Sequence, residues 1–256
     1  MKNISDTLLN RRTIRKYAIK PVDDKLLSKI LEMGCRASTT GNMQVYSIII
    51  TRDAEKKKEL SPLHFGQKMI TEAPVVLTFC ADFNRFNLWC RLRNAEPGYD
   101  NFLSFVTAAI DALLVAQTVC IAAESEGLGI CYLGTTTYTA DKIIEVLKLP
   151  KGVVPITTVT LGWPDEKPEQ VDRLSLEAIT HNELYRDYTN DDIEFFYKEK
   201  ENRKDSRKYI EENCSETHNC TSLAQVFTDV RYKKADNVHF SKTLLKVLND
   251  QGFMNQ

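Results

Sequence analysis

Three arginines near the beginning of the chain are the residues whose type and spacing most clearly suggest chemistry. Arg11, Arg12 and Arg15 fall within five consecutive positions. A guanidinium presents a planar fork of N–H donors that matches pairs of phosphate oxygens, so the cluster is suited to hold an anionic group. Apolar residues recur at helical spacing over 4–10, and the same cations would complement the carbonyl end of that short helix. On its own, however, a basic pentapeptide is better explained as a solvated surface.

Three further segments carry groups that a flat, polar ligand would use. The loop 38–44 contains hydroxyls and amides, and the tripeptide 66–68 (Gly-Gln-Lys) adds an amide and an ammonium before a short helix. Gly134 follows Leu133, and a residue without Cβ lets a backbone N–H come close to a planar ring. Together with the arginines, these segments predict a site for a phosphorylated, planar cofactor with a polar edge.

The composition is that of an ordinary globular protein. The chain has 256 residues, 43% of them hydrophobic and 27% charged, and its formal net charge is −1. This balance gives no global field for nucleic acid or anionic lipid, so we expect neither as a partner. We also expect no membrane span, because no uninterrupted apolar run approaches the roughly 20 residues required, and no secretory signal. Five of the seven cysteines lie in or beside apolar segments, which favours free thiols and a cytoplasmic location: Cys35, Cys80, Cys90, Cys120 and Cys131.

The pattern of apolar residues predicts interleaved helices and strands. We expect strands over 45–51, 75–80, 130–133 and 153–161, and helices over 23–35, 102–126 and 140–147. The helix over 102–126 is apolar nearly all round, so it is either central or packed on a partner subunit. The chain lacks regular βαβ alternation, G-x-G-x-x-G and G-x-x-x-x-G-K-[ST], which disfavours a Rossmann domain or a P-loop NTPase. The charged tail, with an amphipathic helix over 240–248, predicts a helical arm over 186–256 on a core over 1–185.

Seven segments, in unbroken order, resemble the FMN-dependent nitroreductase family. They are Arg11 to Tyr17 with Pro21, Asn42 to Gln44, Gly66 to Lys68, Cys80 to Arg85, Ala122 to Gly129, Tyr132 to Gly134, and Leu161 to Pro164. The resemblance covers residues 1–185 and is closest to the oxygen-insensitive NADPH nitroreductase/flavin reductase branch, which also carries a long C-terminal arm. It implies an α+β, nitroreductase-like fold with a central mixed, mostly antiparallel sheet flanked by helices. It also implies FMN as cofactor, NADPH or NADH as reductant, and a homodimer.

The resemblance assigns roles residue by residue. It implies that the FMN phosphate and ribityl chain are held by Arg11, Arg12, Thr13 and Arg15, with Arg173 as a second phosphate ligand. The loop contacting FMN across a dimer interface would supply Thr39, Thr40, Asn42 and Gln44. Gln67 would face the polar edge of the ring, and Leu133, Gly134 and Thr135 would line it near N5. The sequence departs from the pattern at Val171, where the closest branch tends to have a lysine.

The implied reaction is a ping-pong transfer of hydride from NAD(P)H to a nitroaromatic, quinone or flavin acceptor. No catalytic side chain is implied, since the cofactor carries the chemistry. None of the four histidines, His64, His181, His218 and His239, pairs with a serine or cysteine in a motif of nucleophilic catalysis. The alternatives are a flavin-binding protein without turnover, or another reaction on the same fold, namely flavin fragmentation or reductive dehalogenation.

Two motifs in the tail remain open. Cys214, His218 and Cys220 offer three of the four ligands of a zinc site, and a polar surface loop is the default interpretation, so we predict no metal. The basic run over 198–208 contains Arg203 and Arg207, which are candidates to bind the 2′-phosphate of NADPH. Acidic residues alternate with this run at helical spacing, which favours a solvated helix instead.

Overall fold

The chain divides into two compact units. The computed structural model describes residues 3–214 and 220–255. The larger unit comprises Met1–Gln170 and Phe240–Gln256, and the smaller unit comprises Val171–His239.

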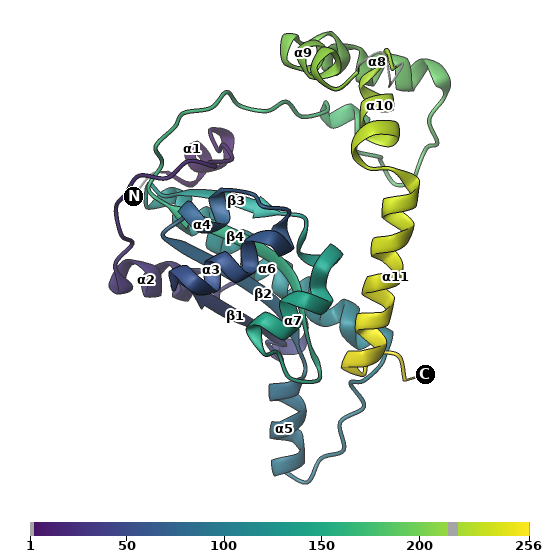
Figure 1. Ribbon diagram of the computed structural model, residues 1–256. Helices are drawn as coiled ribbons and strands as arrows, with labels where there is room; N and C mark the ends of the chain where they lie inside the picture. Colours follow the sequence, from purple (N-terminus) through teal and green to yellow (C-terminus); the bar gives the residue numbers. More distant parts are fainter. Residues whose placement is uncertain (1–2, 215–219, 256) are drawn as a thin grey trace. The chain divides into compact units, whose positions relative to one another are not determined.

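A four-stranded antiparallel sheet forms the centre of the larger unit (Figure 1). Its order is β1-β2-β4-β3, with β1 (Tyr46–Thr51), β2 (Val75–Asp82), β3 (Gly129–Leu133) and β4 (Val153–Gly162). These are the predicted strands to within two residues at each end. The β2–β4 register shifts between Phe79 and Cys80, opposite Pro155, because proline cannot donate to the ladder.

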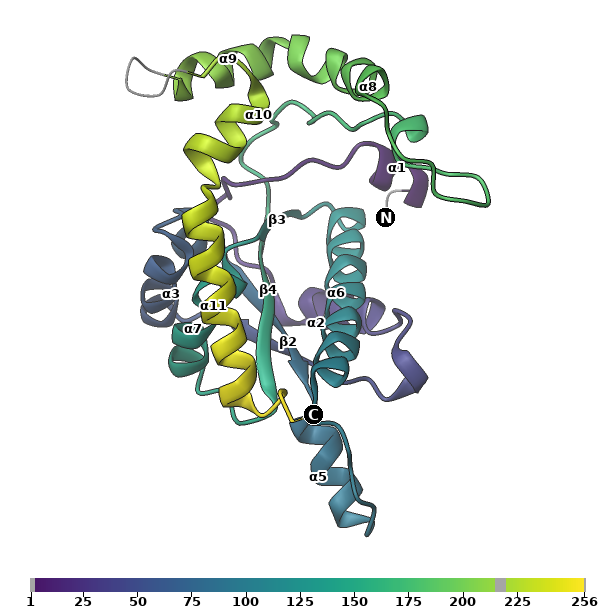
Figure 2. The same ribbon diagram turned by 90° about the vertical axis from the view of Figure 1, so that its right-hand side faces the viewer.

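Helices cover both faces of this sheet, as an α+β fold requires (Figure 2). On one face lie α2 (Asp24–Gly34), capped by Asp23, and α6 (Phe102–Ser125). On the other lie α3 (Ala54–Leu60), α4 (Met69–Glu72) and α7 (Ala140–Leu147). The short helix α1 (Ile4–Leu9) precedes the arginines, and α11 (Lys234–Gln251) returns to the larger unit from Phe240 onward. Its Val247 and Leu248 pack with Val45 and Val154 in one of three core clusters.

Helix α6 has one buried face and one exposed apolar face. Ala112, Val115 and Val119 are buried against α2 and the sheet, whereas Ile110 and Leu114 on the other face are exposed. By length and composition alone α6 is long and apolar enough to cross a membrane, although polar residues interrupt its apolar sequence. The few polar residues of α6 lower its mean hydropathy only slightly. Core helices of soluble proteins also reach this length and mean hydropathy.

Two helices of the larger unit follow no apolar pattern that the sequence could reveal. In α3 only Lys57 and Leu60 are buried, and the helix depends on its N-cap Asp53. Helix α5 (Asn84–Leu92) has no buried residue and extends away from the sheet in both views (Figures 1 and 2).

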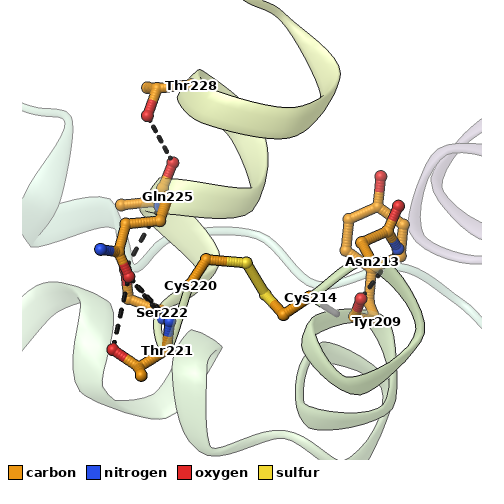
Figure 3. Close-up of a disulfide and its surroundings, with 9 residues drawn as sticks. Tyr209, Asn213, Cys214, Cys220, Thr221, Ser222, Gln225 and Thr228 are labelled. Atoms are coloured by element: carbon orange, nitrogen blue, oxygen red, sulfur yellow. Dashed lines mark hydrogen bonds between the residues drawn. A yellow bond between two sulfur atoms is a disulfide. The ribbon is translucent and has the colours of Figure 1, made fainter. Parts of the chain in front are cut away.

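The smaller unit contains an irregular segment followed by helices, two of which are linked by a disulfide. Its helices are α8 (Asn190–Asn202), α9 (Lys204–Asn213) and α10 (Leu223–Gln225), followed by a π-helical turn over Val226–Arg231. Cys214 and Cys220 form a disulfide that joins the end of α9 to the residues before α10 (Figure 3). Because both sulfurs are in a disulfide, neither is a thiolate ligand for zinc. The structure therefore replaces both earlier interpretations of the two cysteines, a zinc site and a plain polar loop, with a disulfide-closed loop. His218 lies outside the described residues, and the other five cysteines are free, as predicted.

Candidate functional site

The arginine-bearing segment runs alongside strand β3. The backbone N–H of Ile14 donates to Ile130 O at 2.9 Å, and Thr13 forms a parallel bridge with Ile130. Gly129 permits this approach, since a Cβ built there would lie 2.6 Å from the Cβ of Ile14. The Tyr17 hydroxyl donates to Ile14 O at 2.8 Å, and burial raises its pKa. The segment therefore occupies a fixed position on the sheet.

The three arginines have different surroundings. Arg11 Nε forms a 3.4 Å ion pair with Glu124, and Arg12 Nη1 donates to Asn10 O, at the end of α1, at 3.1 Å. Within residues 3–214 and 220–255, no atom accepts a hydrogen bond from the buried Nε–H of Arg12. Arg15 is exposed, and its guanidinium opposes the upward shift that burial gives the pKa of Cys131 in β3. One orphaned donor and one exposed guanidinium thus remain to bind an anion.

Two loops meet beyond the end of β3. Gly134 follows the strand, is exposed, and would have open space around an added Cβ. His64 ends the 3₁₀ turn Ser61–His64, and its Nδ1 lies 2.8 Å from the Thr135 Oγ1. Phe65 and Gly66, at φ 56° and 67°, then turn the chain into the partly buried Gln67. The structure therefore brings the loop that carries Gln67 into contact with the loop that carries Leu133, Gly134 and Thr135.

A buried carboxylate holds both ends of the loop 38–44. The Thr40 N–H donates to Asp111 Oδ1 at 2.8 Å, and the Val45 N–H donates to Asp111 Oδ2 at 3.3 Å. Between them, Gly41, Asn42 and Gln44 all have φ between 54° and 56°. Two of these are not glycine, so the loop stores backbone strain that the carboxylate offsets.

This loop and the arginines lie at opposite ends of the sheet. Tyr46 is in register with Ala81 and through it with Val154, whereas Ile130, the partner of Ile14, is opposite Leu161. The seven residue-to-residue steps along β4 from Val154 to Leu161 span roughly 23 Å. Thr39, Thr40, Asn42 and Gln44 are therefore not brought together with Arg11, Arg12 and Arg15 within one chain.

The remaining predicted residues belong to the smaller unit. Arg173 and Arg203 both line a cavity of about 480 Å³ between the segment 172–175 and α8. Arg173 is exposed and donates to Asp172 O at 2.7 Å. Arg203 donates to both carboxylate oxygens of Asp205, at 2.9 and 3.0 Å, and Arg207 donates to Asn202 Oδ1 at 2.7 Å. Val171, the departure from the family pattern, is exposed at the start of this unit.

These features fit a planar, phosphorylated cofactor such as FMN. The orphaned Arg12 Nε and the exposed Arg15 suit a phosphate, and both belong to the segment paired with β3. The open surface at Gly134 suits the face or edge of a flat ring, and Gln67 is a polar residue of the neighbouring loop.

The chain also matches known proteins along most of its length. The sequence profile of the nitroreductase family matches residues 8–163. The FMN reductase [NAD(P)H] of Bacillus subtilis is 36% identical over 187 residues, covering 72% of this chain and 75% of that protein. The oxygen-insensitive NADPH nitroreductase of Salmonella typhimurium is 34% identical over 181 residues, covering 71% and 74% respectively. A crystal structure from Bacteroides fragilis, provisionally assigned as an oxidoreductase, is 58% identical with a TM-score of 0.94, covering 98% of this chain and all of that one.

The chain belongs to the nitroreductase family. This confirms the resemblance stated from the seven sequence segments, and with it the α+β, nitroreductase-like fold.

Sequence reasoning missed two residues that position the site. Asp111 stands in the middle of a strongly apolar helix, and an acid among apolar neighbours is a signal for a buried carboxylate with partners. His64 stands between Pro62 and Gly66, which mark a turn, but its partner Thr135 is 71 residues away in the sequence. No local pattern identifies such a pair.

Proposed function

We propose that the protein is an FMN-dependent oxidoreductase that takes hydride from NAD(P)H and passes it to nitroaromatic, quinone or flavin acceptors. The names of the two relatives support this activity. The observation that carries it is the convergence on β3, where the arginine segment pairs with the strand and Gly134 opens its end. FMN, when bound, would supply the hydride acceptor and donor.

The chain's own residues would bind and orient that cofactor. Arg11, Arg12, Thr13 and Arg15 would hold the phosphate and ribityl chain, with Arg173 as a further phosphate ligand. Gln67 would donate or accept at the polar edge of the ring, and the backbone of Leu133, Gly134 and Thr135 would line it. A shared face for reductant and acceptor implies a ping-pong order, in which one leaves before the other binds.

We further propose that the active form is a homodimer. Leu103, Ile110 and Leu114 fall on one side of α6 and are 73%, 48% and 44% exposed. A continuous apolar stripe of this kind on a helix is typical of an interface. A dimer would also bring the loop residues Thr39, Thr40, Asn42 and Gln44 of one chain to the arginine segment of another, which a single chain does not do.

Subunit mixing tests this arrangement. In a hybrid of Arg15→Ala and Gln44→Ala chains, one composite site would keep both residues and the other would lose both. Random reassociation should therefore restore FMN binding at about one quarter of the sites. A mixture that binds no more FMN than its parents would refute the shared site.

For the reductant, we propose that Arg203 and Arg207 bind the 2′-phosphate of NADPH. Both lie in or next to the cavity of the smaller unit, although Arg203 is paired with Asp205, as the solvated-helix interpretation expects. The double variant Arg203→Ala/Arg207→Ala should lose its preference for NADPH over NADH. The control removes the neighbouring exposed lysines, Lys204→Ala/Lys208→Ala, and a preference retained in both variants would support the solvated helix.

We place the enzyme in the cytoplasm, where NAD(P)H is produced.

The direct test of the function is the visible spectrum of the purified protein with and without NADPH. We expect bound FMN that is bleached by NADPH and reoxidised by a nitroaromatic or quinone. Arg15→Ala should lower FMN retention, whereas Lys16→Ala, on the adjacent exposed residue, should not. A protein that takes up no FMN would overturn the proposal, and FMN that NADPH does not bleach would favour binding without turnover. A substrate panel distinguishes the reductase from flavin fragmentation or dehalogenation.

A further inference from the structure

His64 is fully buried and joins the two loops that meet beyond β3. Its exposed fraction is 0%, and its Nδ1 lies 2.8 Å from Thr135 Oγ1. Among the residues that the structure describes, none binds its Nε2. None of the roles assigned above to the chain's residues uses this histidine.

The charge state of His64 is set by burial, which lowers its pKa to about 4. A neutral imidazole has one N–H donor and one acceptor nitrogen, so Nδ1 and the Thr135 hydroxyl form one hydrogen bond in either tautomer. That bond fixes the rotamer of Thr135 and, through its backbone, the chain that follows Gly134.

A second hydrogen bond joins the same loops without involving Thr135. The Thr139 Oγ1 donates to Leu63 O at 2.7 Å, one residue before His64. Both hydrogen bonds could stabilise the contact between the two loops, but only the bond from His64 acts on Thr135. Removing them one at a time therefore distinguishes a general structural role from a role at Thr135. On the far side, Thr136 Oγ1 donates to Leu133 O at 3.1 Å, so this loop has little freedom once His64 is in place.

We propose that His64 is a positioning residue that acts through Thr135 to hold the Gly134 and Gln67 loops in one geometry for the FMN ring. The inference rests on the proposed function. Phe65 and Gly66 carry the left-handed turn between His64 and Gln67, so a shift of His64 moves both loops. The effect should fall on the ring rather than on the phosphate, because the arginines are anchored separately on β3.

The test compares His64→Ala, His64→Asn and Thr135→Val with the control Thr139→Val. Asparagine places an amide near the position of Nδ1 and should rescue the hydrogen bond. The measured quantities are FMN affinity of the apo protein from flavin fluorescence, the midpoint potential of bound FMN, and kcat separately from KM. Thermal unfolding of the apo protein reports general destabilisation in each variant.

We expect His64→Ala and Thr135→Val each to weaken FMN binding about five- to tenfold, as loss of one hydrogen bond predicts. Both should shift the midpoint potential and lower kcat more than they change KM for NADPH. The double variant should lose little more than either single one, because both remove the same bond. Thr139→Val should change FMN affinity less than about twofold, even where it lowers thermal stability.

Three outcomes would each overturn the inference. The losses of FMN affinity could add up in the double variant, or the midpoint potential could stay unchanged in His64→Ala and Thr135→Val. Alternatively, Thr139→Val could weaken FMN binding as much as these two variants do. Because Thr135→Val leaves the imidazole in place, the test stands even where His64→Ala fails to fold. Wild-type protein that binds no FMN would refute the proposed function itself. If the wild-type protein binds and reduces FMN, and His64→Ala and Thr135→Val do so equally well, only the role of His64 is refuted.

Discussion

The carboxylate of Asp111 should contribute more to stability than any exposed acid of this chain. Its side chain is 0% exposed within α6 and accepts the N–H groups of Thr40 and Val45. These bonds close a loop whose Asn42 and Gln44 are held at positive φ. The perturbation that tests this argument is Asp111→Ala.

The magnitude follows from the two bonds. A hydrogen bond to a charged group contributes about 1.5–3 kcal/mol, so the pair contributes about 3–6 kcal/mol. Val45 is fully buried, so its N–H cannot turn to water once the carboxylate is removed. Asp111→Asn should lose about half of that amount, because its amide keeps one acceptor and places a donor against an N–H.

The assay is urea unfolding of the apo protein, combined with hydrogen exchange of the Thr40 and Val45 amides. Both amides should lose protection first in Asp111→Ala, ahead of the sheet. The matched control is Asp24→Asn, whose side chain is 91% exposed and pairs only with Arg52 among the described residues, at 2.7 Å. The control should change stability by less than about 1 kcal/mol. Equal unfolding free energies for Asp111→Ala and Asp24→Asn would refute the reasoning.

Three further predictions concern the larger unit. Gly129→Ala should destabilise the apo protein by about 1–3 kcal/mol and weaken FMN binding, because its Cβ would clash with Ile14, whereas Gly134→Ala should leave apo stability unchanged. Urea unfolding of both variants checks this, and equal stabilities would contradict it. Burial lowers the pKa of His64 to about 4, so the unfolded chain binds the extra proton first as pH falls. Stability should therefore decrease from about pH 6.5 to pH 4 by up to about 3 kcal/mol, and His64→Asn should abolish that part of the slope. Lys57 donates to two backbone carbonyls, at 2.8 and 3.1 Å, so Lys57→Met should cost about 2–4 kcal/mol in thermal or urea unfolding, and an unchanged midpoint would show that these bonds contribute little.

The elements that could be predicted are those whose burial imposes a periodic pattern. All eight residues of β2 are buried, and α7 has the strongly one-sided apolar pattern that fixes both of its ends in the sequence. Helices α3 and α5 have almost no buried residues, so burial imposes no apolar periodicity that would reveal them in the sequence. The Cys214–Cys220 disulfide could not be predicted from the sequence either, because a six-residue spacing fits a metal loop, a surface loop or a disulfide.

The candidate site, too, has parts that the sequence predicts and parts that only the structure reveals. The arginines, Gln67 and Gly134 are identifiable because their types suit a phosphate and a ring. Their convergence depends on the β3 register and on the close approach at Gly129, which require the folded chain. Asp111 and His64 act through partners 66 to 71 residues away, so only the structure reveals these contacts.

The predicted site residues and their neighbours also include several of the strained or unpartnered groups of the folded chain. Among the described residues outside glycine, Asn42, Gln44 and Phe65 are three of the six with positive φ. Arg12 and His64 likewise supply two of the five buried, unpartnered polar side-chain atoms in the described part of the chain. Such costs persist where the surrounding structure enforces them, and they concentrate at ligand sites. Because a ligand that binds only the folded state stabilises it, these segments are where FMN should contribute most to stability.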